Sequence, residues 1–186
     1  MVALAYPEPA LGDDVVRLRP WGRGDLATVA EASRDPYIPK VTTVPTPYSK
    51  RAGERWLERQ AARSGGGEAL SLAIAEASTD EAVGALVLGH RGEGLYGLGY
   101  WLVRQARGRG LASRAVALAS AWALARPGVA ELEALVEPWN VASCRVAERA
   151  GFRREGLLRG EISIAGRQAD VIRYVLGGGQ SPRTGS

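Results

Sequence analysis

One stretch of the sequence decides the fold, and it is Gly99-Tyr100-Trp101-Leu102-Val103-Arg104-Gln105-Ala106-Arg107-Gly108-Arg109-Gly110. Its first residues end a predicted strand over 95–103, and its glycines lead into a predicted helix whose apolar positions recur at helical spacing: Leu111, Ala115, Leu118 and Trp122. Glycines let successive backbone N–H groups converge, and the start of a helix adds partial positive charge. The stretch therefore predicts a turn, residues 105–110, that binds an anion such as a pyrophosphate.

A glycine-rich turn can also bind mononucleotides or dinucleotides, so the surrounding sequence must decide which kind of ligand this turn binds. A P-loop is excluded because no Lys-Ser or Lys-Thr follows Gly110. A Rossmann unit is disfavoured because residues 70–74 and 83–88, joined by the polar turn 78–81, are typical of an antiparallel hairpin. Coenzyme A is the remaining anion carrier. Arg107 and Arg109 either add charge at the rim of the turn or are ordinary surface side chains.

The flanking sequence predicts one domain over residues 15–176, with an N-terminal extension (1–14) and a flexible C-terminal tail (177–186) that is poor in apolar residues. Four prolines between residues 35 and 48 argue against a regular helix there. The other predicted elements are a strand at 15–19, a helix capped by Asp25 and running to about Ser33, a helix capped by Ser49, a strand at 132–136, a helix from Asn140 to Gly151, and strands at 152–159 and 169–176 around a turn at 165–166.

Composition removes several classes of function. The chain has 186 residues, one cysteine and one histidine, so neither an internal disulfide nor a metal cluster is expected. It begins without a basic start or an apolar run, which predicts a cytoplasmic protein that does not engage a membrane. Although the formal charge is +4, the basic residues are scattered, and nucleic-acid binding is disfavoured.

Two motifs resemble the GCN5-related N-acetyltransferase (GNAT) superfamily. The first is Gly99-Tyr100-Trp101-Leu102 before the turn at 105–110. The second is Asn140-Val141-Ala142-Ser143, followed by Val146-Ala147-Glu148-Arg149-Ala150-Gly151-Phe152 and Glu155-Gly156, which is similar to a signature of the ribosomal-protein N-terminal (Rim-type) branch. The resemblance extends to the opening strand at 15–21 and the closing strand at 170–176.

This resemblance implies an α/β (α+β) fold with a mixed, strongly twisted, mostly antiparallel sheet of about six to seven strands and helices on both faces. Its fourth and fifth strands, here 95–103 and 132–136, are expected to splay apart and admit the pantetheine arm of coenzyme A.

The resemblance also implies a set of site residues. Asn140 is expected at the pantetheine arm, and Ser143 is expected to give a proton to the departing thiolate, although both are also ordinary residues for a helix start. Glu137 and Glu161 are the candidate bases. Cys144 is most simply a packing residue, and His90 a loop residue. The expected cofactor contacts are Trp101, Leu102, Val103, Gln105, Arg107, Gly108, Arg109, Gly110, Leu111, Ala112, Asn140 and Ser143.

The activity implied is transfer of an acetyl group from acetyl-coenzyme A to a primary amine, either a protein α-amino group or a small amine, without a metal. The irregular segment 35–48 is expected to form a wall over the acceptor. A domain that binds acyl-coenzyme A without turnover is the alternative function, and the chain is expected to be a monomer or a homodimer.

Overall fold

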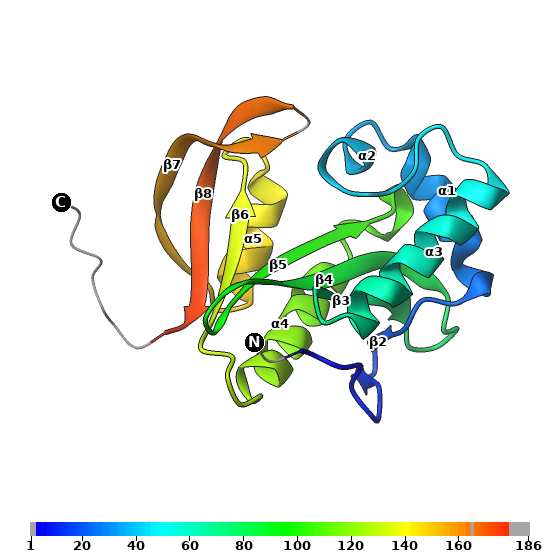
Figure 1. Cartoon of the computed structure of the whole chain (residues 1–186), viewed down its shortest axis with the longest axis horizontal. Coiled ribbons are helices and arrows are strands. Elements are labelled where there is room, and N and C mark those ends of the chain that lie inside the picture. The colour runs from blue at the N-terminus through cyan, green and yellow to red at the C-terminus, as the bar shows by residue number, and fades with distance from the viewer. Residues whose placement is uncertain (1–2, 165, 179–186) are drawn as a thin grey trace.

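The computed structural model describes residues 3–164 and 166–178, which form one twisted sheet with helices on both faces (Figure 1). The strand order is β1-β2-β3-β4-β5-β6-β8-β7. Strands β5 and β6 run parallel, and the other neighbouring pairs are antiparallel. The strands are β1 (Leu11–Gly12), β2 (Val16–Arg19), β3 (Ala69–Glu76), β4 (Ala82–Gly92), β5 (Leu95–Leu102), β6 (Glu131–Val136), β7 (Arg153–Ile164) and β8 (Arg167–Gly177). The expected fold class is confirmed.

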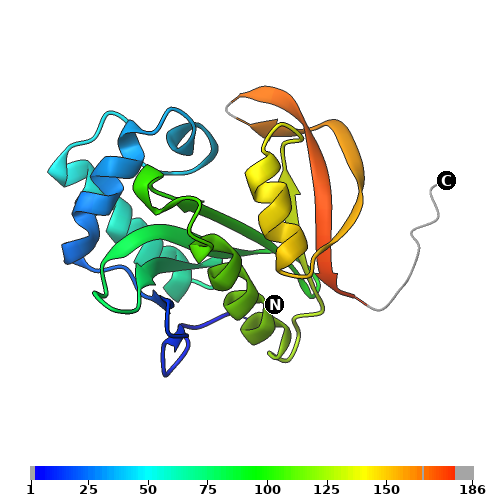
Figure 2. The same ribbon diagram turned by 180° about the vertical axis from the view of Figure 1, so that it is seen from behind.

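The helices divide between the two faces of the sheet. Helix α3 packs on β3, whereas α4 and α5 lie together on the opposite face, where Figure 2 shows them in front. The helices are α1 (Leu26–Arg34), α2 (Ile38–Val41), α3 (Lys50–Gly65), α4 (Leu111–Leu124) and α5 (Val141–Arg149), with short 3-10 turns η1 (Arg23–Asp25) and η2 (Arg104–Ala106).

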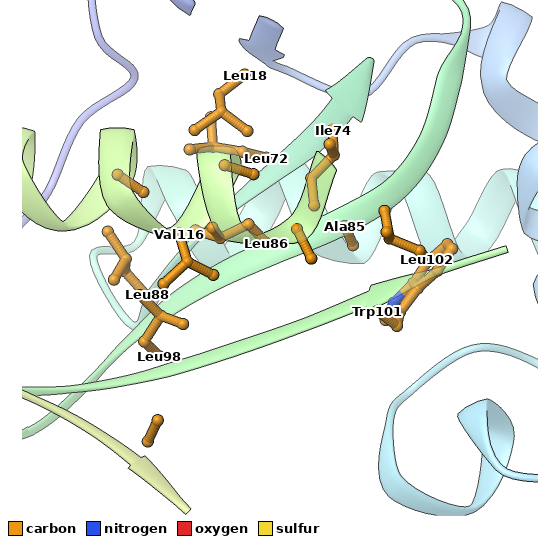
Figure 3. Close-up of a cluster of buried hydrophobic side chains, with 14 of the residues drawn as sticks. Leu18, Leu72, Ile74, Ala85, Leu86, Leu88, Leu98, Trp101, Leu102 and Val116 are labelled. Atoms are coloured by element: carbon orange, nitrogen blue, oxygen red, sulfur yellow. The ribbon is translucent and has the colours of Figure 1, made fainter. Parts of the chain in front are cut away.

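The main core lies between α4 and the sheet. In Figure 3, Val116 of α4 stands over leucines of three strands, among them Leu72, Leu86 and Leu98. These four side chains are all buried, as the alternation of apolar residues along the strands requires. Burial of this apolar face supplies the main stabilisation of the sheet that carries the glycine turn.

A second cluster on the α3 side consists of three tryptophans. The Trp21 ring stacks on Trp101 of β5 at 6.0 Å between centroids, and meets Trp56 of α3 edge-on at 5.0 Å. Aromatic pairs favour these two geometries because the ring face is negative and the ring edge positive. The cluster therefore attaches the end of β2 and helix α3 to β5.

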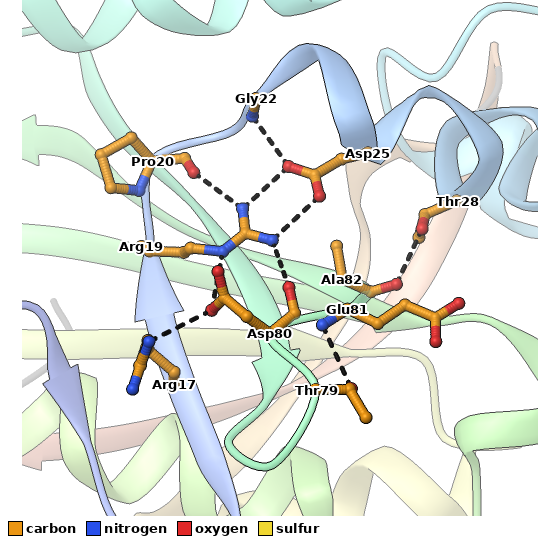
Figure 4. Close-up of polar contacts among 10 residues, drawn as sticks. All are labelled: Arg17, Arg19, Pro20, Gly22, Asp25, Thr28, Thr79, Asp80, Glu81 and Ala82. Atoms are coloured by element: carbon orange, nitrogen blue, oxygen red, sulfur yellow. Dashed lines mark hydrogen bonds and ion pairs between the residues drawn. The ribbon is translucent and has the colours of Figure 1, made fainter.

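The end of β2 is also held by a polar network (Figure 4). The guanidinium of Arg19 donates to both carboxylate oxygens of Asp25, at 2.8 and 2.9 Å, and to the backbone oxygen of Asp80 at 2.6 Å. Asp25 also accepts from the backbone N–H of Gly22 at 2.7 Å. This network joins β2, the β3–β4 turn and the start of α1.

Two expectations for residues 20–48 were wrong in detail. Asp25 does not cap α1 with its side chain, because its carboxylate is bound to Arg19 and Gly22; the helix also continues one residue past Ser33, to Arg34. The proline-rich segment contains one helical turn, α2, because Pro39 stands in its first turn, where no backbone N–H is required.

Several other elements are confirmed. The hydroxyl of Ser49 accepts from the Ala52 N–H at 3.1 Å and caps α3. Strands β3 and β4 form the expected antiparallel hairpin, although β4 runs on to Gly92 and so includes His90, which was expected in a loop. Its ring instead lies against Tyr96.

The C-terminal hairpin is longer than expected, because β7 continues to Ile164 and β8 begins at Arg167. Of the expected turn, Gly166 has a left-handed φ of 76°, and Ala165 lies outside the described residues. At the N-terminus, β1 falls within the expected extension and pairs with β2. Of the expected tail, residues 179–186 also lie outside the description. No helix in the described part of the chain is long and apolar enough to cross a membrane.

The sheet opens between β5 and β6. Their pairing covers Leu95–Gly97 against Glu131–Glu133, after which the two strands separate, as Figure 1 shows. We call the opening beyond Gly97 and Glu133 the slot. The splay expected between these two strands is thus observed.

Candidate active site

The glycine turn connects β5 to α4 at one end of the slot. Gly108 and Gly110 both have a φ of 78°, a left-handed conformation that disfavours any residue with a Cβ. Gly110 is the N-cap of α4, with no side-chain hydrogen bond to the helix start. A Cβ built on either glycine would meet no atom within 4 Å. The first-turn N–H groups of α4 therefore have open space for an anion, which fits a pyrophosphate.

The long side chains of this turn bind carboxylates on neighbouring elements. Arg109 pairs with Glu76 of β3 at 2.6 Å, and Gln105 contacts Glu31 of α1. Arg107 pairs with Asp35 at 2.6 Å and donates through Nε to the backbone oxygen of Leu102 at 3.0 Å. In this arrangement the positive potential of the turn comes mainly from backbone N–H groups and the start of α4.

The β5 backbone turns alternate peptide groups away from β4, and of these the Leu102 oxygen accepts from Arg107 Nε. The N–H of Val103 donates to Val83 of β4 at 2.9 Å. Because peptide groups alternate in direction along a strand, those of Leu102 and Tyr100 face away from β4, toward the slot. An extended amide chain such as pantetheine can pair with such groups, as a further strand would.

The remaining expected contacts around the turn are mostly buried. The Trp101 ring belongs to the tryptophan cluster on the α3 side, so its side chain lies across the sheet from α4 and α5. Leu102, Val103, Leu111 and Ala112 are buried as well and pack in the core. Their side chains stabilise the strand end and the helix start, while their backbones line the turn.

Asn140 and Ser143 meet at the start of α5. The side-chain oxygen of Asn140 accepts from the Ser143 N–H at 3.1 Å, so Asn140 caps the helix as the sequence indicates. The N–H of Asn140 in turn donates to the Glu137 backbone oxygen at 2.9 Å, which closes a turn between β6 and α5. These contacts hold Ser143 in the first turn of α5, beside the slot.

The structure adds a residue that the sequence did not single out as chemical. Tyr100 of β5 places its hydroxyl 3.0 Å from the Ser143 hydroxyl. Burial raises the pKa of Tyr100 above its usual value, against the opposing effect of the Ser143 hydrogen bond. The available signal was strand alternation, which puts Tyr100 on the same face as Leu98 and Leu102.

Glu137 lies just past β6 with both carboxylate oxygens bound. It is 4% exposed, accepts from the Tyr37 hydroxyl at 2.6 Å, and is bound on its other oxygen by Arg167 of β8. We call these three residues the Glu137 cluster. Burial alone would raise the pKa of Glu137, but hydrogen bonds from Tyr37, Trp139 and Arg167 outweigh it and hold that pKa below its usual value.

Tyr37 and Trp139 complete this side of the site. Their rings meet edge-on at 4.9 Å between centroids, and Trp139 remains 60% exposed. Burial, followed by the neighbouring Glu137, raises the pKa of Tyr37, so its hydroxyl stays protonated and donates. The cluster thus attaches the segment 35–41 to the β7–β8 hairpin at the far end of the slot.

Two other candidates from the sequence have different outcomes. Glu161 lies on β7, but its side chain is outside the described residues. Cys144 is partly buried and packs against the core. No group of three or more His, Cys, Asp or Glu side chains that suits a metal ion occurs within the described ranges.

Sequence comparison agrees with this geometry. The profile of the acetyltransferase (GNAT) domain matches residues 16–153. An uncharacterized N-acetyltransferase of Bacillus licheniformis, p20, is 32% identical over 112 residues, which cover 59% of this chain and 63% of that protein. The N-acetyltransferase YjcK of Bacillus subtilis is 38% identical over 69 residues, 37% of this chain and 38% of that protein. The matched segments thus span less than two thirds of either relative.

Solved structures share the fold at low identity. RimJ of Mycobacterium smegmatis, in complex with a coenzyme A disulfide, superposes with a TM-score of 0.75 at 24% identity and covers 87% of this chain and 81% of its own. A ribosomal-protein-serine acetyltransferase of Vibrio cholerae has a TM-score of 0.75 at 20% identity, with 92% and 98% covered.

Proposed function

The chain belongs to the GNAT acetyltransferase family, and from that premise we propose that it transfers an acetyl group from acetyl-coenzyme A to a primary amine. The transfer takes place by direct attack in a ternary complex, with acetyl-coenzyme A in the slot and no metal ion.

The observation that carries this proposal is the junction of the glycine turn with the slot. Gly108 and Gly110 leave room for a pyrophosphate at the start of α4. The slot begins where β5 leaves β6, and the peptide groups of Tyr100 and Leu102 there do not point toward β4. An anion site followed by an unpaired strand edge is complementary to coenzyme A, which carries a pyrophosphate at one end of a chain of amides.

For direct transfer the main task of the protein is to position the amine next to the thioester. The neutral amine nitrogen attacks the thioester carbon, the new C–N bond forms, and the C–S bond then breaks with its electron pair on sulfur. The amine releases its extra proton, and the thiolate gains one. Ser143, in the first turn of α5, is our proposed donor to the sulfur, and Asn140 holds the helix start that presents it.

We assign Glu137 a holding role rather than that of the base. Both of its oxygens already accept hydrogen bonds, and its pKa lies below the usual value, so it has little tendency to take a proton. Its negative charge and its contact with Tyr37 instead set the wall formed by segment 35–48. Glu161 remains our candidate for the base, acting directly or through water.

For the acceptor we favour an α-amino group or a small amine over an internal lysine. An α-amine has a pKa near 8 and is partly neutral at pH 7, whereas a lysine amine near 10.4 must first be deprotonated. An α-amine thus needs only modest help from a base. Fold neighbours that carry names of ribosomal-protein acetyltransferases support the same class.

The test is a screen of small amines and peptides with acetyl-coenzyme A, with release of free thiol as the readout. Mass spectrometry of peptides that carry both a free α-amine and an internal lysine then locates the acetyl group. Acetylation of the lysine alone would overturn our acceptor class. Tight binding of acetyl-coenzyme A without turnover of any amine would favour the alternative, a non-catalytic acyl-coenzyme A sensor.

The matched control for this screen is Gly110→Glu, which places a carboxylate in the turn. It is expected to remove both binding and turnover. A folded Gly110→Glu protein with unchanged activity would remove the assignment of the turn, whatever the acceptor.

A further inference from the structure

Tyr100 and Ser143 form a side-chain bridge across the mouth of the slot. Tyr100 lies on β5 three residues beyond the last β5–β6 pair, and Ser143 lies on α5, which follows β6. Their oxygens are 3.0 Å apart. No local sequence preference brings these two residues together, since they are 43 positions apart. The contact therefore depends on the splay of the two strands.

The chemistry of the pair sets the direction of this hydrogen bond. A phenol O–H is a stronger donor than the aliphatic O–H of serine, so the Tyr100 hydroxyl donates and the Ser143 oxygen accepts. Ser143 Oγ is the hydrogen-bond partner that the structure provides for the Tyr100 hydroxyl within the described residues. Ser143 then accepts from Tyr100 and has its own proton available.

A serine hydroxyl that accepts one bond donates in another direction, because its lone pairs and its proton point apart. The Ser143 backbone is already held by Asn140 through the 3.1 Å cap. The Asn140 bond fixes the Ser143 backbone, and the Tyr100 bond acts on the Ser143 side-chain oxygen. The Ser143 proton is thus directed away from the Tyr100 hydroxyl.

We propose that Tyr100 is a positioning residue that orients the Ser143 hydroxyl toward the departing sulfur. This inference rests on the proposed function, in which Ser143 donates to the thiolate. Tyr100 transfers no proton in this scheme. The electron pair of the broken C–S bond goes to sulfur, which takes the Ser143 proton, and the Tyr100 O–H stabilises the Ser143 oxygen until Ser143 regains a proton from solvent.

The experiment compares Tyr100→Phe, Ser143→Ala and the double variant, with Tyr174→Phe as the matched control. Tyr174 is a buried tyrosine that, like the partly buried Tyr100, contacts α5, but its hydroxyl bonds Glu148 at 3.2 Å rather than Ser143. Each variant is measured for kcat, for the KM of the amine, for acetyl-coenzyme A affinity by calorimetry, and for thermal unfolding. Phenylalanine keeps the ring at both tyrosine positions, which preserves packing.

We expect Tyr100→Phe to lower kcat about tenfold, one part of the roughly hundredfold help that an oriented acid gives. Its acetyl-coenzyme A affinity is expected to stay within about twofold. The double variant should be no slower than Ser143→Ala alone, because Tyr100 acts only through Ser143. Tyr174→Phe should retain wild-type kcat.

The outcomes separate the two proposals. If Ser143→Ala is slow but Tyr100→Phe is not, the inference on Tyr100 fails and the proposed role of Ser143 stands. If Tyr100→Phe slows the Ser143→Ala protein further, or mainly weakens acetyl-coenzyme A binding, Tyr100 acts independently and the inference is overturned. If Ser143→Ala keeps wild-type turnover while chemistry is rate-limiting, the proposed function of Ser143 itself fails.

Discussion

Replacement of Glu137 by glutamine tests the Glu137 cluster directly. The carboxylate is 4% exposed and accepts from Tyr37 and from Arg167 on separate oxygens. An amide keeps one acceptor oxygen and presents an NH₂ group where the second donor stands, so one of the two bonds is lost. A hydrogen bond to a charged group contributes about 1.5–3 kcal/mol. We expect Glu137→Gln to lower the free energy of unfolding by ~2 kcal/mol, since Arg167 is partly exposed and recovers hydration.

The same cluster predicts a pH dependence with a defined sign. The folded-state pKa of Glu137 lies below its usual value. The stabilisation is therefore fully present above the unfolded-state pKa, about 4.3. It is lost as the pH falls below that value and through the folded-state pKa. The stability difference between wild type and Glu137→Gln should accordingly shrink below about pH 4.

The assay is urea unfolding followed by tryptophan fluorescence between pH 3 and 7. Glu133→Gln is the matched control, because its partner Arg173 retains Glu131 at 2.7 Å and a contact with Glu155. We expect less than ~1 kcal/mol from that change. Equal losses for the two variants, or a Glu137→Gln deficit that does not change between pH 7 and pH 3, would refute the argument that Glu137 is a buried, doubly bound carboxylate.

Three further predictions concern the turn, the serine and the sheet. Gly110→Glu should abolish acetyl-coenzyme A binding in calorimetry, because the side chain would place a negative charge in the anion site; an unchanged dissociation constant contradicts this. Ser143→Ala should lower the single-turnover rate roughly a hundredfold with little change in acetyl-coenzyme A affinity, and equal losses in both would make it a binding residue. Gly84→Ala should lower the free energy of unfolding by ~3 kcal/mol in the same urea assay, since a Cβ there would collide with the Trp101 backbone oxygen. The control is Gly92→Ala, whose Cβ would meet no neighbouring atom and which should lower that free energy by less than ~1 kcal/mol.

The parts of the fold that follow from local chemistry could be predicted from the sequence. Ser49 and Asn140 cap helices because a side-chain oxygen reaches an N–H three residues on, a relation contained within one short segment. The glycine turn is equally local, since Gly108 and Gly110 adopt backbone conformations that other residues avoid. The β3–β4 hairpin was predicted from its polar turn, and the splay between β5 and β6 from the family resemblance.

The parts that depend on distant partners could not be predicted in this way. Asp25 occupies a capping position, but its carboxylate accepts two hydrogen bonds from Arg19, six residues earlier in the chain. This charged pair is stronger than a hydrogen bond to a helix N–H would be. Arg107 and Arg109 pair with Asp35 and Glu76, and no local pattern in the sequence indicated these two contacts. Tyr37 reaches Glu137 across 100 positions of sequence, and no periodicity encodes that contact.

The short parallel seam between β5 and β6 has a consequence for amide hydrogen exchange. Past Gly97, every second β5 amide still bonds β4, as Val103 does to Val83, while those of Tyr100 and Leu102 face the slot. Exchange along this strand should therefore alternate between slow and fast on successive residues, although all of them belong to one strand of the sheet. A chain of amides laid in the slot would protect the fast set alone, so the alternation and its loss would map, residue by residue, the path taken by a bound ligand.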